Sequence, residues 1–213
     1  MRKEIQKEVD VKFKRMHKNA TLPVYAHPGD IGMDVSAVSV EYDEEKDIFI
    51  YSTGLACESD VGIGTFGAPR SSNCKTECYL PNSIATVDSA TYRGDIQFRY
   101  KLRTSRETWV HNTAMTFYAR LPWYSKLFHK YSYDKLVIYW RKYYIEHAID
   151  MFAPYEVNPD VKIGQLVVLE HPYVNVIETD ILSETERGTG GFGSTNKVKT
   201  KKINKKSTKT VKK

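Results

Sequence analysis

Short stretches of alternating apolar and polar residues recur along most of the chain. Residues 9–15, Val-Asp-Val-Lys-Phe-Lys-Arg, show the period of two that is typical of a half-buried strand. Similar short stretches lie at 33–40, 48–55, 84–87, 96–102, 163–169 and 174–177. Gly, Pro, Asn and Asp separate many of them, as in the loop at 21–30. Many short strands with frequent turns predict an all-β barrel or sandwich.

Residues 104–152 depart from this pattern. The segment holds 13 of the 26 aromatic residues of the chain. Its apolar positions follow a helical spacing, which predicts an amphipathic helix over 134–150. The stripe consists of Leu136, Trp140, Tyr143, Tyr144, Ala148 and Met151. Such a stripe is more typical of packing against the rest of the chain, or against a neighbouring subunit, than of direct ligand binding.

Composition limits the class of protein. The 213 residues suit one domain with an elaboration, or two small domains. No apolar run approaches 18 residues, so no membrane span is expected. The charged N-terminus lacks the apolar core of a secretory signal. Only three cysteines occur, Cys57, Cys74 and Cys78, and they are expected to be buried or half-buried free thiols. The sparse cysteines and the absence of a secretory signal lead us to expect a cytoplasmic protein. A chain with a segment as long as 104–152 outside its strands would suit a bacterium or a bacterial virus, so the cytoplasm of a bacterial or phage-infected cell is expected.

The positive charge of the chain is concentrated at its C-terminal end. Residues 197–213 hold nine lysines and no acid, so the formal charge of +6 becomes −3 for residues 1–196. This tail has almost no apolar content and is expected to be disordered. It could make weak contacts with nucleic-acid phosphates, or it could only aid solubility.

The most distinctive run is Arg187–Thr195, Arg-Gly-Thr-Gly-Gly-Phe-Gly-Ser-Thr. Glycines allow successive backbone N–H groups to approach a ligand closely, and an arginine fork suits phosphate. The run does not follow a strand and open a helix, so it is not a dinucleotide fingerprint. On its own it fits either a linker or a loop that closes over a ligand.

Four further segments place polar side chains beside glycines or turns. They are Asp30-Ile-Gly-Met-Asp34, Ala68-Pro-Arg-Ser-Ser72, the stretch 82–95 and Ile163-Gly-Gln-Leu166. With the glycine-rich run, and in this order, these segments resemble the five motifs of the trimeric dUTPase family. The corresponding residues are 30–38, 68–73, 82–94, 162–167 and 187–195. The resemblance covers about residues 9–103 and 153–196.

The resemblance implies a jelly-roll-like β-barrel that forms a homotrimer with active sites shared among subunits. Residues 1–103 and 153–196 would form the barrel domain and its glycine-rich C-terminal arm. Residues 104–152 would be a partly helical, aromatic-rich insertion, followed at the end of the chain by the lysine-rich tail. The implied reaction is hydrolysis of dUTP to dUMP and pyrophosphate with Mg²⁺ on the triphosphate.

The resemblance also implies roles for individual residues. Asp88 would activate the attacking water, Asn82 would read the uracil edge, and Tyr92 would exclude a 2′-hydroxyl. Asp34 would act on the magnesium through water, and Phe192 would stack on the base. The remaining substrate-binding residues would hold phosphates. They are Arg70, Ser71, Ser72, Gln165, Arg187, Gly193, Ser194 and Thr195.

One spacing differs from the family pattern. The family places its acid three residues before the tyrosine, whereas Asp88 and Tyr92 are four apart. Either the turn bulges, or Ser89 takes the usual position of the acid. A serine could not serve as the base there, so Asp88 is retained as the catalytic residue.

Two alternatives stay open. The first is a dCTP deaminase-like enzyme on the same fold, although residues 96–100, Ile-Gln-Phe-Arg-Tyr, lack the glutamate that such an enzyme uses. The second is a non-catalytic nucleotide-binding regulatory protein that uses the aromatic segment to hold a partner.

Overall fold

The computed structural model describes residues 8–122 and 132–185. It divides into two units, residues 1–173 and 174–213. The first carries all of the helices and strands of the described residues. Five predicted site residues lie outside the described part of the chain, as does the lysine-rich tail. They are Arg187, Phe192, Gly193, Ser194 and Thr195.

The described part of the second unit has no regular structure. Residues 174–185 form neither helix nor strand, so the predicted strand at 174–177 is wrong. Alternation of apolar residues fits a strand only when a neighbouring strand satisfies its backbone groups. Within residues 8–122 and 132–185, no strand pairs with this stretch, and Val174, Val176 and Ile177 are strongly exposed.

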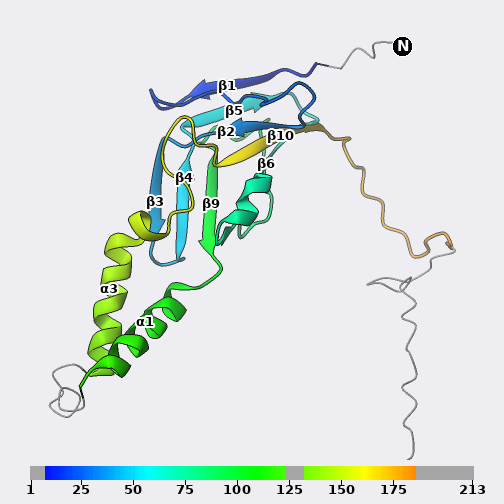
Figure 1. Cartoon of the computed structure of the whole chain (residues 1–213). Coiled ribbons are helices and arrows are strands. Elements are labelled where there is room, and N and C mark those ends of the chain that lie inside the picture. The colour runs from blue at the N-terminus through cyan, green and yellow to red at the C-terminus, as the bar shows by residue number, and fades with distance from the viewer. Residues whose placement is uncertain (1–7, 123–131, 186–213) are drawn as a thin grey trace, which may run out of the picture. The chain divides into compact units, whose positions relative to one another are not determined.

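In the described part of the first unit, ten antiparallel strands form three sheets (Figure 1). The first sheet pairs β1 (Val11–Arg15) with β5 (Leu55–Ser59). The second has the order β2-β10-β6-β8, with bounds Gly32–Val35, Gly164–Glu170, Ile63–Ala68 and Ala85–Val87. The third has the order β3-β4-β9-β7, with bounds Ser39–Asp43, Ile48–Ser52, Gln97–Leu102 and Cys78–Tyr79. This mostly antiparallel β architecture is compatible with the expected jelly-roll-like fold.

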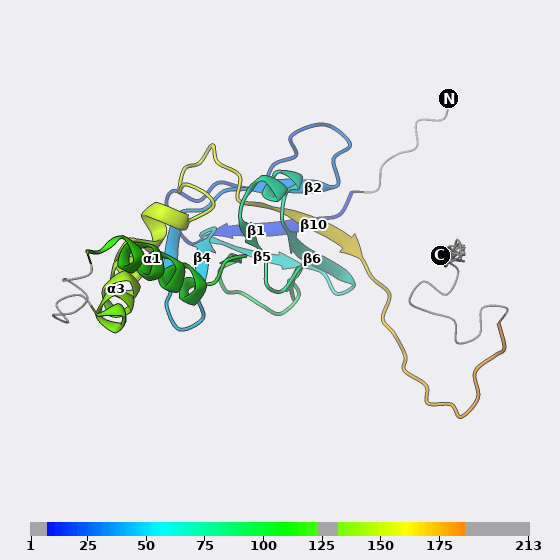
Figure 2. The same cartoon turned by 60° about the horizontal axis from the view of Figure 1, so that its bottom comes forward.

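Two predicted strands are each divided in the structure. The stretch 33–40 contributes to β2 and β3, which belong to different sheets. The stretch 48–55 is interrupted at Gly54, whose φ of +65° suits glycine. After this turn, β5 leaves the sheet of β4 and pairs with β1 (Figure 2). Hydropathy located these two stretches but did not show where the chain changes sheets.

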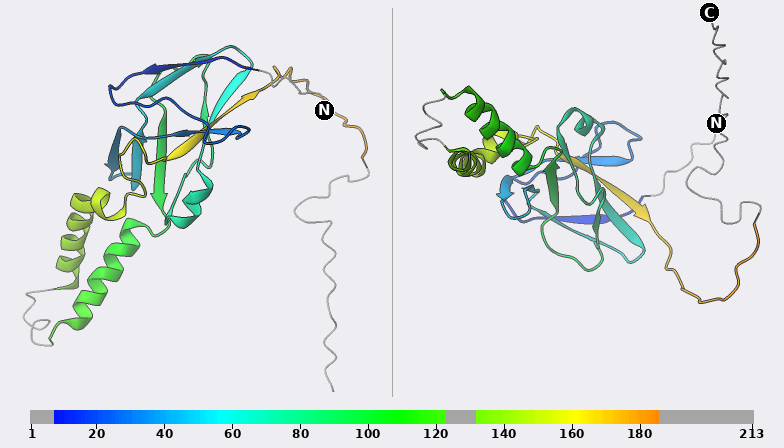
Figure 3. Two further views of the ribbon diagram at one scale, coloured as in Figure 1. Left: turned by 45° about the horizontal axis from the view of Figure 1, so that its top comes forward. Right: turned by 90° about the horizontal axis from the view of Figure 1, so that it is seen from below.

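Two helices of the described residues lie between β9 and β10. α1 spans Arg106–Arg120 and α3 spans Tyr133–Phe152, so the predicted helix over 134–150 is confirmed. Ser105 and Ser132 cap their N-termini, each accepting a backbone N–H bond three residues later. The two helices lie side by side, on the same side of the sheets in further views (Figure 3). No helix of the described residues is long and apolar enough to cross a membrane.

One hydrophobic core joins the sheets and the helices. Val110 of α1 and Tyr144 and Ala148 of α3 are buried with the residues of the sheets. The Tyr144 ring lies 6.0 Å from Tyr42 of β3 and 5.3 Å from Trp109 of α1, measured between ring centroids. The helices therefore pack on the β-core and are not an independent domain.

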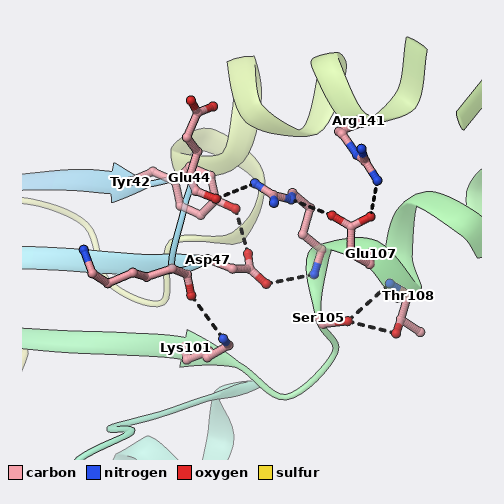
Figure 4. Close-up of polar contacts among 10 residues, drawn as sticks. Tyr42, Glu44, Asp47, Lys101, Ser105, Glu107, Thr108 and Arg141 are labelled. Carbon is pink, nitrogen blue, oxygen red and sulfur yellow. Dashed lines mark hydrogen bonds and ion pairs between the residues drawn. The ribbon is translucent and has the colours of Figure 1, made fainter. Parts of the chain in front are cut away.

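Polar contacts fix the start of α1 to the turn between β3 and β4 (Figure 4). The Asp47 carboxylate accepts a 2.6 Å bond from the Tyr42 hydroxyl and a 2.9 Å bond from the Arg106 backbone N–H. The Arg106 guanidinium donates to the Glu44 carbonyl at 2.7 Å. Glu107 pairs with Arg106 and with Arg141, which links α1 to α3.

Candidate functional site

Strand β10 brings three distant sequence segments together. Gln165 lies opposite Asp34 of β2 on one side and opposite Ala68 of β6 on the other. Arg70 follows β6 by two residues. Because β10 runs between these two strands, the first, second and fourth segments of the sequence prediction meet at one end of this sheet. We refer to Asp34, Arg70 and Gln165 as the arginine cluster.

Contacts within the arginine cluster orient the guanidinium. Arg70 Nε lies 2.9 Å from Asp34 Oδ1, and Arg70 is more exposed than Asp34. Gln165 Nε2 donates to the Pro69 carbonyl at 3.2 Å, just before Arg70. Gly32 leaves room for the Gln165 side chain in this position, because a Cβ would lie 2.5 Å from Gln165 Oε1. A half-exposed guanidinium held by one carboxylate keeps N–H donors for an anion.

The turn that carries Arg70 has a buried support that the sequence prediction missed. Ser71 and Ser72 begin a short 3₁₀ helix, Ser71–Lys75. The backbone N–H of Asn73 donates to the Arg70 carbonyl at 2.9 Å. The buried Asn73 side chain donates to the Cys78 carbonyl at 3.1 Å and accepts from the Tyr155 hydroxyl at 2.9 Å. In the sequence, the one signal for Asn73 was its position directly after Arg70-Ser71-Ser72.

Asp88 begins a single helical turn after β8. Its carbonyl accepts bonds from the backbone N–H groups of Thr91 at 2.9 Å and Tyr92 at 2.7 Å. The Asp88 residue is exposed. Ser89 is fully buried, and its hydroxyl lies 2.6 Å from that of Ser59. The hydroxyl of Ser89 thus faces the core, while the Asp88 carboxylate is available to solvent. The turn accommodates the extra residue between Asp88 and Tyr92.

The other residues expected to contact the nucleoside are also exposed. Tyr92 is 48% exposed and donates a 3.2 Å bond to the Asp95 carbonyl. Gly94 allows this conformation, because a Cβ would collide with the Tyr92 hydroxyl. Asn82 lies in the loop before β8, next to Ser83, which has a φ of +59°. The structure therefore presents Asn82, Asp88 and Tyr92 around β8.

The Asp88 turn and the arginine cluster lie towards opposite ends of β6. Val87 pairs with Thr65, so Asp88 lies beside the first part of β6, next to Gly64. Arg70 comes six residues after Gly64. At about 3.3 Å per strand residue, roughly 20 Å separates the two groups along the strand. One copy of the chain does not bring the Asp88 carboxylate beside its own Arg70.

The described residues contain no group of three or more His, Cys, Asp or Glu side chains that could hold a metal ion. Asp34 is the carboxylate of the arginine cluster, and one of its oxygens is already paired with Arg70.

Comparisons with known proteins point to one group of enzymes. No family model matches the chain. The deoxyuridine 5′-triphosphate nucleotidohydrolase of Picosynechococcus sp. is 29% identical over 182 residues, which is 85% of this chain and 94% of that protein. The protein of the same name from Alkaliphilus metalliredigens is 27% identical over 187 residues, 87% of this chain and 96% of that protein.

Solved structures show the same relationship in the fold. A mutant of the Staphylococcus bacteriophage 80alpha dUTPase, solved with dUpNHpp, matches with a TM-score of 0.53 and 17% identity. The match covers 87% of this chain and 98% of that one. The dUTPase of phage phi11 of S. aureus matches with a TM-score of 0.51 and 14% identity, over 83% of this chain and 99% of that one. The predicted resemblance to dUTPases is confirmed.

Proposed function

We propose that this chain, which resembles dUTPases along most of its length, hydrolyses dUTP to dUMP and pyrophosphate. The observation that carries the proposal is the convergence of Asp34, Arg70 and Gln165 through β10, in a chain that presents Asp88 on an exposed turn. Phosphate groups need oriented cations and N–H donors, and hydrolysis needs a carboxylate that can accept a proton from water.

Asp88 acts as the general base in this proposal. It takes a proton from a water whose oxygen forms a bond to the α-phosphorus. The bond from that phosphorus to the oxygen bridging to the β-phosphate breaks, and pyrophosphate leaves. The Asp88 carboxylate suits this step because it is exposed while its neighbour Ser89 is buried.

Substrate selection belongs to the residues around β8. The Tyr92 ring would lie under the sugar, where it leaves no room for a 2′-hydroxyl. Asn82 offers both a donor and an acceptor, which suits the edge of uracil. Phe192 would stack on the base, as aromatic side chains do on nucleobases.

The phosphates are divided between two groups of residues. Arg70, Ser71, Ser72 and Gln165 would hold the α- and β-phosphates, and the Asp34 pair fixes the direction of the Arg70 fork. Arg187, Gly193, Ser194 and Thr195 would hold the β- and γ-phosphates by closing over the substrate. Such closure excludes bulk water from the reacting centre.

Magnesium is the proposed cofactor. Mg²⁺ prefers oxygen ligands, keeps several waters and often binds through one or two carboxylates plus substrate phosphates. One carboxylate within the arginine cluster, that of Asp34, fits this pattern. The bound ion would neutralise phosphate charge. Asp34 would contact it through water while keeping its bond to Arg70.

A homotrimer with shared sites is the proposed assembly. The Asp88 turn lies about 20 Å along β6 from Arg70 of the same chain. A base must lie within hydrogen-bond reach of the attacking water. A second copy of the chain must therefore supply the arginine cluster. Exposed apolar side chains on residues 173–182, including Tyr173 and Val176, favour association with other copies.

The test measures pyrophosphate release from dUTP, dCTP, dTTP and UTP with magnesium. We expect turnover of dUTP alone, and a loss of about 10²- to 10⁴-fold in kcat for Asp88→Asn, because the base is removed. Asp60→Asn is the matched control, since it removes the charge of another exposed loop aspartate. Ammonia release from dCTP would support the deaminase alternative. Binding of dUTP without turnover would support the regulatory alternative.

A further inference from the structure

The side chain of Arg93, directly after Tyr92, closes the turn that begins at Asp88. Its Nη1 donates to the carbonyls of Ser89 at 2.9 Å and Tyr92 at 3.0 Å. Its Nη2 donates to the carbonyl of Ala90 at 3.1 Å. One guanidinium thus binds three of the carbonyls of a five-residue turn, and these bonds are additional to the two that the backbone makes to Asp88.

An acidic residue on a neighbouring strand holds this guanidinium. Glu58 of β5 lies 3.2 Å from Arg93 Nη2 through its Oε2 atom. Its other oxygen accepts a 3.1 Å bond from Lys12 of β1. The hydrogen bond from Lys12, followed by the charges of Lys12 and Arg93, lowers the pKa of Glu58. Glu58 is therefore anionic at neutral pH and ties Arg93 to the β1–β5 sheet.

A third contact ties the same turn to the same strand. The backbone N–H of Ser59 donates to the Ser89 carbonyl at 3.2 Å, and the two serine hydroxyls are bonded inside the core. Ser89 is therefore held by contacts inside the core, whereas Arg93 is held by Glu58 at the surface. Between these two anchors, Asp88 and Tyr92 remain exposed, and their positions depend on the shape of the turn.

The turn from Asp88 to Tyr92 is one residue longer than the family pattern, so more conformations must be restricted to keep its shape. A longer turn has more conformations, and each additional rotatable residue costs conformational entropy when it is fixed. The Arg93 guanidinium makes four contacts from two nitrogens fixed in one plane, to three carbonyls and to Glu58, whereas a lysine has three N–H donors on a single nitrogen. A lysine in place of Arg93 would keep the charge for Glu58 but could not reproduce the three bonds.

We propose that Arg93, held by Glu58, is a positioning residue that fixes the Asp88–Tyr92 turn for dUTP hydrolysis. The inference rests on the proposed function. It assigns to Arg93 no contact with substrate. The side chain is 47% exposed, so its removal should leave the core intact. The carboxylate and the tyrosine ring would move relative to a substrate that Asn82 and the arginine cluster still bind.

The experiment compares Arg93→Gln, Arg93→Lys and Glu58→Gln with Lys12→Gln. The last variant is the matched control, because it removes a cation from Glu58 without touching the turn. Steady-state kcat and KM are measured for dUTP and UTP. Thermal melting and hydrogen exchange of the peptide covering residues 85–95 are measured on the same samples.

We expect Arg93→Gln to lower kcat for dUTP by about tenfold or more, because small misplacements of a catalytic group are costly. KM should change by less than about threefold, since the binding residues remain. Relative turnover of UTP should rise, hydrogen exchange in residues 85–95 should quicken, and the melting temperature should stay close to that of the control. Arg93→Lys should recover part of the loss, and Glu58→Gln should show a smaller effect in the same direction.

Three results would overturn the inference, and they are distinguishable. If the parent chain turns over dUTP and Arg93→Gln matches Lys12→Gln in kcat and in hydrogen exchange, the positioning role is wrong and the proposed function stands. If the parent chain does not turn over dUTP, the proposed function fails and the inference fails with it. A fall in kcat matched by a fall in melting temperature, without recovery in Arg93→Lys, would reduce Arg93 to a structural role.

Discussion

Adjacent residues in this chain have opposite environments, which matters most at Asp88 and Ser89. The serine hydroxyl is buried against Ser59, whereas the aspartate is exposed. The glycines of the motifs also make room for different side chains. Gly164 makes room for the Phe98 ring in the core, since a Cβ there would collide with it, whereas Gly32 makes room for the Gln165 side chain.

The cysteines show the same contrast. Cys57 and Cys78 are buried free thiols, as expected, but Cys74 is exposed, so the prediction was wrong for that residue. The short helix Ser71–Lys75 turns Cys74 outward, which hydropathy does not report. Burial, followed by the charge of Glu77, raises the pKa of Cys78 to about 11. Burial also raises the pKa of Cys57.

These environments predict the reactivity of the thiols. At pH 8 a disulfide reagent such as DTNB should modify one thiol quickly in the native protein, because the thiolate is the reactive form. All three should react in denaturant. Cys74→Ser should abolish the fast phase, whereas Cys57→Ser should leave it unchanged. Rapid modification of Cys78 in the native protein would contradict its buried position.

At the level of elements, the attachment of α1 and α3 depends on a small number of polar contacts. Asp47, with a φ of +57°, joins the turn between β3 and β4 to the first residue of α1. Burial, followed by the hydrogen bond to Asp47, raises the pKa of Tyr42, which therefore remains a donor at neutral pH. Tyr42 also packs on Tyr144, so one residue serves both the polar and the apolar contact.

The variant Asp47→Asn tests this attachment. Asparagine tolerates positive φ but has a single oxygen acceptor, so one of the two bonds to Tyr42 and Arg106 is lost. We expect a loss of about 1–2 kcal/mol in the free energy of unfolding. Faster proteolysis between residues 104 and 120 should accompany it.

Asp43→Asn is the control, since the bonds of its side chain to Lys46 lie within the same turn and do not reach α1. Equal protease resistance of the two variants would show that Asp47 does not hold α1 in place. Turnover of dUTP should be retained in both, because no proposed site residue lies on the two helices.

At the scale of the whole molecule, the separation along β6 supports the proposal that each site takes residues from more than one copy of the chain. The Asp88 turn and the arginine cluster cannot serve one phosphate group within a single copy, since about 20 Å of strand lies between them. Closed symmetric assemblies are the usual solution for soluble homo-oligomers. The proposal of a homotrimer thus depends on the distance along β6 between the Asp88 turn and Arg70.

Subunit mixing tests this arrangement directly. Asp88→Asn and Arg70→Ala should each be inactive as homotrimers, because each lacks one half of every site. When the two are unfolded together, refolded and verified as mixed, about a quarter of the parent activity should return, since random closed assembly gives one intact pairing in four. Mixing without recovered activity would show that both residues act from the same copy.

Local physical chemistry, which can be read from the chain alone, determined the main elements and the residue types of the site. Period-two alternation located β1 and β9, and helical spacing located α3, because each element exposes one face to the core. In the apolar stripe predicted for α3, Leu136, Tyr144 and Ala148 are buried as expected, although Met151 is exposed. Strand β6 was not predicted from the sequence. Its sequence, Ile-Gly-Thr-Phe-Gly-Ala, has glycines at positions where neighbouring side chains pack close to the backbone, so it lacks the apolar side chains that mark a strand.

Only the tertiary structure decided which residues meet. Strand register placed Gln165 between Asp34 and Ala68, and the same register set the Asp88 turn far from Arg70. The support of Arg93 by Glu58, 35 positions apart in sequence, follows from the same cause. Register depends on hydrogen bonds and side-chain packing between distant segments, and no local pattern of apolar and polar residues records those partners.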